Sequence, residues 1–134
     1  TRQMREAAKT KSELLKEAQY EFNNYIRLRD KGEPCIRCGR MHDGQFHAGH
    51  YLSVGSAGEL RFEESNCFSQ CAPCNNHLSG NQINYRKRLV EKIGIERVEW
   101  LEGPHDQPNW THDEIRAIKQ TYKDKTKALR GKDV

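Results

Sequence analysis

Two pairs of cysteines constrain the fold of this chain more than any other feature of its sequence. Cys35 and Cys38 form the first pair, Cys71 and Cys74 form the second, and two residues separate the cysteines of each pair. This spacing lets one tight turn direct both sulfurs at a tetrahedral zinc ion, and two such turns complete a four-sulfur site. The sequence therefore predicts a structural Zn²⁺ held by these four cysteines. The alternative, two unrelated pairs of buried or redox-active cysteines, is disfavoured because the spacing recurs.

The segment between the two pairs is longer than a zinc site alone requires. It contains 32 residues, whereas a simple zinc ribbon has roughly 15–20 there. We therefore expect the metal to hold a hairpin-sized insertion that carries the function. The fifth cysteine, Cys67, is separated from Cys71 by three residues, a spacing that suits a zinc knuckle less well. We expect its thiol to be a small buried side chain.

The composition fits a small domain that a metal stabilises. The 134 residues suit one structural domain, and 34% hydrophobic beside 31% charged residues indicates a thin core, so metal binding would supply needed folding free energy. No stretch approaches the ~20 apolar residues of a membrane span, and no signal peptide opens the chain, so we expect a cytoplasmic protein. The net charge of +4 permits a polyanionic partner without requiring one. Because the chain begins at Thr1, we expect it to be a fragment.

We expect an α+β fold with a small zinc-stabilised core between helical segments. The predicted divisions of this single domain are an N-terminal amphipathic helix in residues 1–32, the core in residues 33–94 and a helical extension in residues 95–134. Residues 1–31 lack Gly and Pro, and Thr10 with Glu13 forms a possible capping box. An apolar stripe marks one face of this helix, formed by Leu15, Ala18, Phe22, Tyr25 and Ile26. The stripe is a candidate dimer interface, unless it packs on its own domain.

Turn residues and periodicity predict the remaining elements. Residues 45–52 predict a short β-hairpin, and a helix that opens at residue 79 is expected to stop at Gly94. A short helix follows in residues 96–102, and a capping box of Thr111 and Glu114 begins a last helix that runs to about Leu129. The side chains expected to be buried in the two middle helices are Ile83, Leu89, Val90, Ile93, Val98, Trp100 and Leu101.

Imidazole and amide side chains gather between and just after the cysteine pairs. They are His47, His50, Asn66, Asn75, Asn76 and His77. A strand ending in His50, a loop anchored by Asn66 and a helix beginning just after Cys74 would bring these groups to one phosphate-sized cleft. This arrangement resembles the HNH, or ββα-metal, nucleases, which have an asparagine five residues before the third zinc cysteine. Asn66 and Cys71 have that spacing.

The two histidines of the strand have different expected roles. His50 is the expected general base, because a neutral imidazole with a pKa near ~6.5 can take a proton from water; the alternative is a packed structural histidine. His47 is expected to bind a catalytic divalent cation, and the alternative is an exposed loop histidine. Because these residues are three apart, a regular strand would point them to opposite faces, so we expect a bulge at Gly49.

The residues after the last cysteine could bind the same cation. The amide oxygen of Asn75 suits Mg²⁺ or Mn²⁺, but the same side chain suits a helix N-cap, in which case Asn76 or His77 would share the task. His77 could contact the metal or the leaving phosphate, or make a structural hydrogen bond. Asn66 is expected to tie the loop through backbone hydrogen bonds and so to hold His50 in place.

A closer resemblance to one family rests on five segments. They are residues 25–30 (YIRLRD), 34–39 (PCIRCG), 48–51 (AGHY), 60–62 (LRF) and 70–81 (QCAPCNNHLSGN). From about residue 11 to residue 129 the chain resembles the phage NinG (Rap-type) recombination endonucleases. Some members carry aspartate at the position of His47, and others begin with an additional cysteine-bearing basic segment. The resemblance implies a phage- or prophage-encoded, metal-dependent enzyme that cuts branched DNA, such as Holliday junctions and displacement loops, and leaves 5′-phosphate ends.

These inferences predict a hydrolase with two separate metals. The four cysteines would hold structural Zn²⁺, and His47 and Asn75 would hold a hydrated Mg²⁺ or Mn²⁺ at the scissile phosphate. His50 would then activate water for in-line attack while the divalent cation stabilises the leaving oxygen.

The expected partner is branched DNA, and two other functions compete with the nuclease. Arg61, Arg86 and Arg88 are the predicted contacts to DNA phosphates, although charged runs are more often solvated surfaces. Two symmetric cuts in a four-way junction need two active sites, so we expect a homodimer, with phage or host recombination proteins as further candidate partners. The first rival is a non-catalytic zinc-knuckle DNA-binding module in which His50 is structural. The second is a redox or zinc-sensing switch that uses Cys67.

Overall fold

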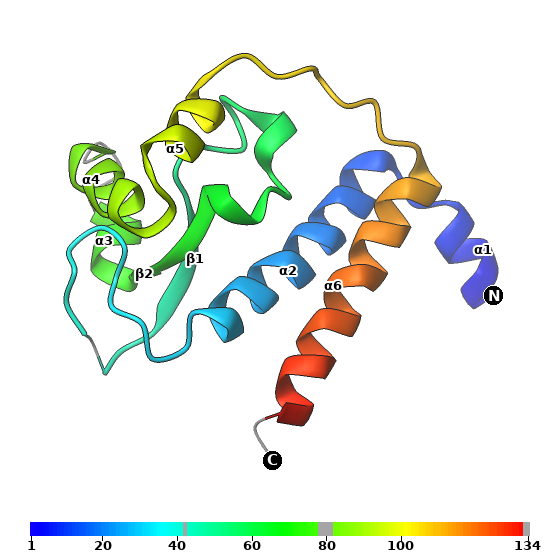
Figure 1. Ribbon diagram of the computed structural model, residues 1–134. Helices are drawn as coiled ribbons and strands as arrows, with labels where there is room; N and C mark the ends of the chain where they lie inside the picture. The colour runs from blue at the N-terminus through cyan, green and yellow to red at the C-terminus, as the bar shows by residue number, and fades with distance from the viewer. Residues whose placement is uncertain (42, 78–81, 133–134) are drawn as a thin grey trace. The chain divides into compact units, whose positions relative to one another are not determined.

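The computed structural model describes residues 1–41, 43–77 and 82–132, without the side chains of residues 76, 77 and 132. The chain forms two compact units (Figure 1). The helical unit comprises Thr1–Tyr25 and Asn109–Val134, and the cysteine unit comprises Ile26–Pro108. The limits of these units do not coincide with the divisions expected after residues 32 and 94, and those divisions stay a prediction.

The helical unit contains α1 (Arg2–Ala7), α6 (His112–Lys132) and most of α2 (Lys11–Arg29). The part of α2 that belongs to this unit ends at Tyr25. The expectation of one helix over residues 1–31 is wrong, because the chain breaks at residues 8–10. The break follows from the capping box at Thr10, whose hydroxyl accepts the Glu13 N–H at 3.1 Å and starts a new helix. The predicted cap at Thr111 is also confirmed, because its hydroxyl accepts the Glu114 N–H at 3.1 Å.

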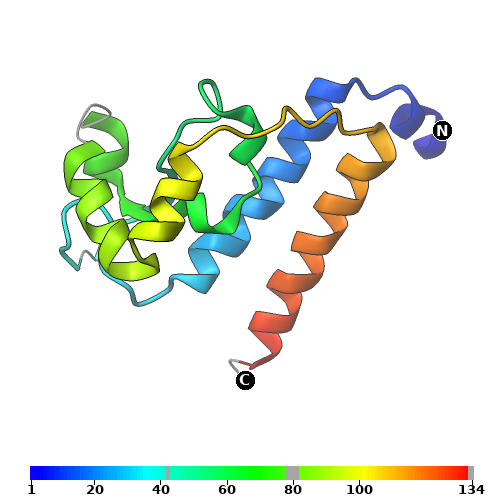
Figure 2. The same ribbon diagram turned by 45° about the horizontal axis from the view of Figure 1, so that its top comes forward.

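Helices α2 and α6 run side by side and parallel (Figures 1 and 2). The buried row of α2 in this unit is Leu14, Ala18 and Phe22, spaced by four residues, so Leu14 rather than Leu15 leads it. The ring of Phe22 meets the ring of Tyr122 edge-on, with centroids 4.9 Å apart. The stripe expected as a candidate dimer interface therefore packs within its own chain. The homodimer itself stays a prediction.

The cysteine unit is built on a two-stranded antiparallel ribbon. Strand β1 (Phe46–His50) pairs with β2 (Cys67–Cys71), and the register runs regularly from Phe46 opposite Cys71 to His50 opposite Cys67. The tight hairpin expected within residues 45–52 is wrong, because the partner strand lies beyond a connection of residues 51–66. Two short 3₁₀ helices, Gly58–Leu60 and Glu64–Asn66, shape that connection.

Three helices follow the ribbon and complete a mixed α+β fold. They are α3 (Ala72–His77), α4 (Gln82–Ile93) and α5 (Ile95–Glu102). Gly94 joins the last two with a φ of +89°, a backbone conformation that favours glycine. The core of this unit includes the buried side chains Ile36, Tyr51, Leu60, Phe68, Tyr85, Leu89, Val98 and Leu101.

Two side chains expected in this core lie outside it. Ile83 is 71% exposed, because Tyr85 and Leu89, four residues apart, define the buried face of α4. Trp100 is 43% exposed, and the Arg97 guanidinium lies 4.0 Å from the centroid of its ring. No helix among the described residues has the length and apolar character needed to cross a membrane.

Candidate metal centre and active site

The four predicted cysteines come together as one cluster. Their sulfur atoms all lie within 4.8 Å of one another, and the Sγ atoms of Cys38 and Cys71 are 3.9 Å apart. A tetrahedral zinc ion with Zn–S bonds of about 2.3 Å separates its sulfurs by about 3.8 Å, whereas a disulfide needs about 2.05 Å. All five cysteines are free thiols. The cluster could therefore hold a metal ion such as zinc.

The two halves of the cluster are built differently. Cys35 and Cys38 lie in a turn in which the Gly39 N–H donates to the Cys35 carbonyl at 2.8 Å, and Gly39 has a φ of +74° that favours glycine. Cys71 ends β2, and Cys74 lies inside α3. The expectation that this helix begins after Cys74 is wrong, because α3 starts directly at the end of the strand.

The thiols of the cluster differ in how readily they lose their protons. Burial alone would raise the pKa of the Cys35 thiol, but hydrogen bonds from the N–H groups of Cys38, Cys71 and Arg37 outweigh it and lower this pKa to about 7. Burial raises the pKa of Cys74. Metal binding must therefore release protons, because a zinc ion needs thiolates. The buried guanidinium of Arg37 donates to the Cys74 carbonyl at 3.3 Å and brings a positive charge close to the cluster.

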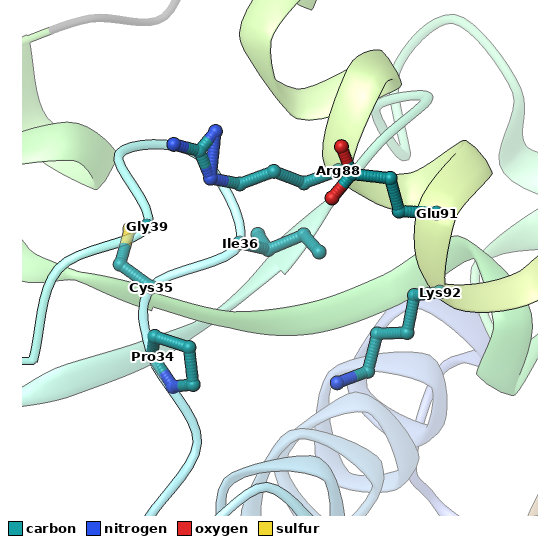
Figure 3. A pocket seen from close by; sticks show the side chains of 7 residues that line it. All are labelled: Pro34, Cys35, Ile36, Gly39, Arg88, Glu91 and Lys92. Carbon is teal, nitrogen blue, oxygen red and sulfur yellow. The ribbon is translucent and has the colours of Figure 1, made fainter.

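A cavity of about 430 Å³ lies beside the first cysteine pair (Figure 3). Arg88 reaches from α4 to the turn and donates to the Cys38 carbonyl at 3.1 Å. A Cβ atom at Gly39 would lie 2.4 Å from the Arg88 Nη2 atom, so the guanidinium packs directly on the glycine. Arg88, a predicted DNA contact, thus binds the metal-binding turn.

His50 ends β1 with both ring nitrogens near a partner. Its Nε2 atom lies 3.1 Å from the Arg61 carbonyl oxygen, and its Nδ1 atom lies 3.7 Å from the Cys67 sulfur. A carbonyl oxygen can only accept, so the neutral ring carries its proton on Nε2 and its lone pair on Nδ1. Burial lowers the pKa of His50 below its ordinary value of 6.5, and burial raises the pKa of the Cys67 thiol. The neutral imidazole is therefore the favoured form at pH 7.

His47 lies on the other face of the ribbon. The strand pairing is regular through Gly49, so the expected bulge is wrong and His47 and His50 point to opposite faces. The residue opposite His47 is Gln70, and its side-chain nitrogen donates to the Asn75 Oδ1 atom at 2.7 Å. His47, Gln70 and Asn75 therefore form one polar group on this face. Asn75 lies inside α3, so the N-cap alternative for it is wrong.

A glycine at the centre of this face leaves room for the Gln70 side chain. A Cβ atom at Gly49 would lie 2.3 Å from the Gln70 Nε2 atom, so the Gln70 side chain crosses directly over Gly49. The role of Gln70 was missed by sequence reasoning, although it immediately precedes a metal-binding cysteine. Only the strand register shows that it stands between His47 and Asn75.

Asn66 ties the connection between the strands as predicted. Its backbone oxygen accepts the Tyr51 N–H at 2.8 Å, its side-chain oxygen accepts the Leu52 N–H at 3.1 Å, and its amide donates to the Leu52 carbonyl at 3.0 Å. The side chain is completely buried. These bonds fix the two residues after His50. The side chains of Asn76 and His77 lie outside the described residues.

The other two predicted DNA contacts have partners within the chain. Arg86 forms two hydrogen bonds with the Glu102 carboxylate, at 2.8 and 3.0 Å, and the Tyr51 hydroxyl donates to the same carboxylate at 2.5 Å. Arg61 lies over the Phe62 ring at 5.4 Å, and burial lowers the pKa of its guanidinium. Among the three arginines, none is a plainly exposed phosphate ligand.

Arg29 and Asp30 hold the start of β2 in place, and sequence reasoning missed both. The buried Asp30 carboxylate accepts the Ser69 N–H at 2.9 Å and two hydrogen bonds from Arg29, at 2.8 and 2.9 Å. Arg29 also donates to the Cys67 carbonyl at 2.7 Å. Because Cys67 faces His50 across the ribbon, this ion pair supports the position of the imidazole.

Known proteins resemble this chain over almost its whole length. The family described as Bacteriophage Lambda NinG protein matches residues 1–132. Protein ninG of Salmonella phage P22 is 45% identical over 124 residues, which cover 92% of this chain and 61% of the relative. Protein ninG of Escherichia phage lambda is 44% identical over 125 residues, covering 93% of this chain and 61% of the relative. The chain thus spans about three-fifths of the length of these relatives. No solved structure matches it.

Proposed function

Because this chain belongs to the NinG family of bacteriophage proteins, we propose that it is a metal-dependent endonuclease that cuts branched DNA. The proposed fold of the cysteine unit is an HNH core, in which a zinc ion on the four cysteines is structural. The proposed substrates are Holliday junctions and displacement loops, met in the cytoplasm of the host cell. The observation that carries the proposal is the contact of 3.1 Å between the His50 Nε2 atom and the Arg61 carbonyl oxygen, which fixes the tautomer of the imidazole.

His50 has the properties of a general base. The Arg61 carbonyl accepts the proton of Nε2, and the lowered pKa keeps the imidazole neutral at pH 7, so Nδ1, which lies 3.7 Å from the Cys67 sulfur, carries the lone pair. In the proposed step a water molecule replaces the Cys67 thiol at Nδ1, and a water proton moves to Nδ1 while the water oxygen forms a bond to phosphorus. The bond from phosphorus to the 3′ oxygen breaks, which leaves a 5′-phosphate and, after protonation by solvent, a 3′-hydroxyl.

His47 and Asn75 are the proposed ligands of a divalent cation, with Gln70 opposite His47 on the ribbon and hydrogen-bonded to Asn75. Imidazole nitrogen and amide oxygen are acceptable ligands for a partly hydrated Mg²⁺ or Mn²⁺. The cation would neutralise the phosphate and stabilise charge on the leaving oxygen. His47 and His50 act from opposite faces, so one phosphate must reach both across the ribbon edge.

The test is cleavage of a synthetic four-way junction by the zinc-loaded protein. The junction is incubated with Mg²⁺ or Mn²⁺ and compared with a linear duplex of the same sequence. The proposal expects cutting near the branch point with 5′-phosphate ends, and little cutting of the duplex. Junction binding without cutting under either cation would contradict the proposal and favour the non-catalytic zinc-knuckle module.

The same reaction reports on the oligomeric state. Paired, symmetric cuts require two active sites on one junction, so we propose that a homodimer acts there. Native mass spectrometry of the protein bound to the junction should show two chains per DNA molecule. One chain per junction that still makes paired cuts would contradict the dimer.

A further inference from the structure

The net positive charge of this protein lies in one of its two units. The helical unit has 12 Lys and Arg against 8 Asp and Glu, which gives +4, whereas the cysteine unit has 11 against 11, which gives zero. Four thiolates on one zinc ion would lower the charge of the cysteine unit to −2. The unit that carries the proposed catalytic residues therefore does not attract a DNA backbone by its net charge.

Many cations of the cysteine unit are also committed to partners within it. Arg29 pairs with Asp30, Arg86 pairs with Glu102 and Arg97 pairs with Glu63, all at 3.2 Å or less. Arg37 and Arg88 donate to the carbonyls of the cysteine turns. A phosphate that recruited these groups would first have to break internal bonds.

Helix α6 instead presents five cations in one stripe. They are Arg116, Lys119, Lys123, Lys127 and Arg130. Their spacing of three, four, four and three residues keeps them within about 80° of helix surface and spreads them over about 21 Å. The acids Asp113 and Asp124 lie to one side of this stripe, because each is displaced from its centre by about 80° or more around the helix. The stripe is therefore a continuous line of positive charge.

The stripe consists of two cations that form ion pairs with carboxylates and three other cations, which form its available half. Arg116 pairs with Asp113 at 3.2 Å, and Lys119 pairs with Glu17 at 3.0 Å. Lys123, Lys127 and Arg130 are exposed, and among the described residues no carboxylate forms an ion pair with them. Cations in a last helical turn also offset the helix dipole, but Lys123 lies two turns further from the end of α6. Stabilisation of the helix C-terminus therefore does not explain why Lys123 is positively charged and exposed.

We propose that this available half, Lys123, Lys127 and Arg130, binds the sugar-phosphate backbone of the DNA substrate. This inference rests on the proposed function for the identity of the polyanion. Consecutive cations rise by about 4.5–6 Å along the helix, comparable with the ~3.4 Å rise between phosphates of one strand. Contacts to phosphates carry no direct sequence information. Binding through this stripe is therefore independent of sequence, as recognition of branched DNA by its shape requires.

The test measures junction affinity against salt concentration in protein that carries His50→Ala, so that binding is separated from cutting. The stripe variant adds Lys123→Gln, Lys127→Gln and Arg130→Gln, changes that keep helix propensity nearly constant. The matched control adds Lys31→Gln, Arg40→Gln and Lys87→Gln, three exposed cations of the cysteine unit. Circular dichroism and zinc content confirm that both variants are folded.

The stripe variant should lower the slope of log affinity against log salt by roughly 2.7, and weaken binding at 0.1 M salt on the order of 10²-fold. The control should change the slope by less than about 1. Equal losses in the two variants, or an unchanged slope in the stripe variant, would overturn the proposal. Cleavage that persists in the His50→Ala protein would contradict the proposed nuclease mechanism. The two slopes of log affinity against log salt would still show whether the stripe binds DNA.

Discussion

The Asp30 carboxylate should be the most costly single charge to remove from the cysteine unit. Its side chain is 6% exposed and holds Arg29, whose side chain is 22% exposed, and it also accepts the Ser69 N–H. Asp30→Asn keeps the shape and one acceptor oxygen, but it leaves a largely buried guanidinium without its counter-charge. Removing one partner of a buried pair costs roughly 3–5 kcal/mol. We expect a loss of this size in the free energy of unfolding.

The same substitution on the surface supplies the control. Asp113 also pairs with an arginine, Arg116, but the Asp113 side chain is 94% exposed. Asp113→Asn should therefore cost less than about 0.5 kcal/mol, the usual contribution of an exposed helical pair. Urea unfolding of both zinc-loaded variants, followed by circular dichroism, measures the difference. If the free energies of unfolding of the Asp30→Asn and Asp113→Asn proteins differed by less than about 1 kcal/mol, the role assigned to the buried pair would be wrong.

Three further predictions concern the base, the metal and the ribbon. Burial lowers the pKa of His50 from 6.5, so the fall of kcat/KM for junction cleavage at acidic pH should have its midpoint below pH 6.5; a midpoint above 6.5 would contradict this. Cys35→Ser should abolish tight zinc binding and cooperative thermal unfolding, as judged by metal analysis and calorimetry, and retained zinc at one ion per chain would count against the four-sulfur centre. Gly49→Ala should lower the free energy of unfolding by roughly 1–3 kcal/mol, because the added Cβ would overlap the Gln70 side chain. The control is Gly44→Ala, which has open space around it and should change the free energy of unfolding by less than about 0.5 kcal/mol in the same urea assay.

The features that the sequence predicted correctly depend mostly on residues that lie close together along the chain. The cysteine spacing predicted the sulfur cluster, and the caps at Thr10 and Thr111 followed from residues three positions apart. The sulfur cluster and the two caps depend on short segments or on a repeated local pattern. The bonding of Asn66 to backbone groups was also predicted correctly, because asparagine side chains commonly bond to the backbone, although its partners Tyr51 and Leu52 lie in a distant part of the chain.

The rest depended on pairings between distant segments. The partner of β1 could not be found within residues 45–52, because it lies at residues 67–71. The register of that pairing, and not local sequence, decides that no bulge occurs at Gly49. The sequence alone suggests that Arg86 is a free cation. In the fold, α5 places the Glu102 carboxylate beside it. The opposite faces of His47 and His50 and the position of Gln70 follow from the same register.

The measurement that tests the central claim most directly is the single-turnover rate of junction cleavage by His50→Ala. The control is His112→Ala, because His112 is an exposed histidine at the start of α6. With equal zinc content and equal junction affinity, we predict a rate that falls by roughly 10²–10⁴-fold in His50→Ala, while His112→Ala matches the unaltered chain. Equal rates in all three proteins would show that His50 is not the base.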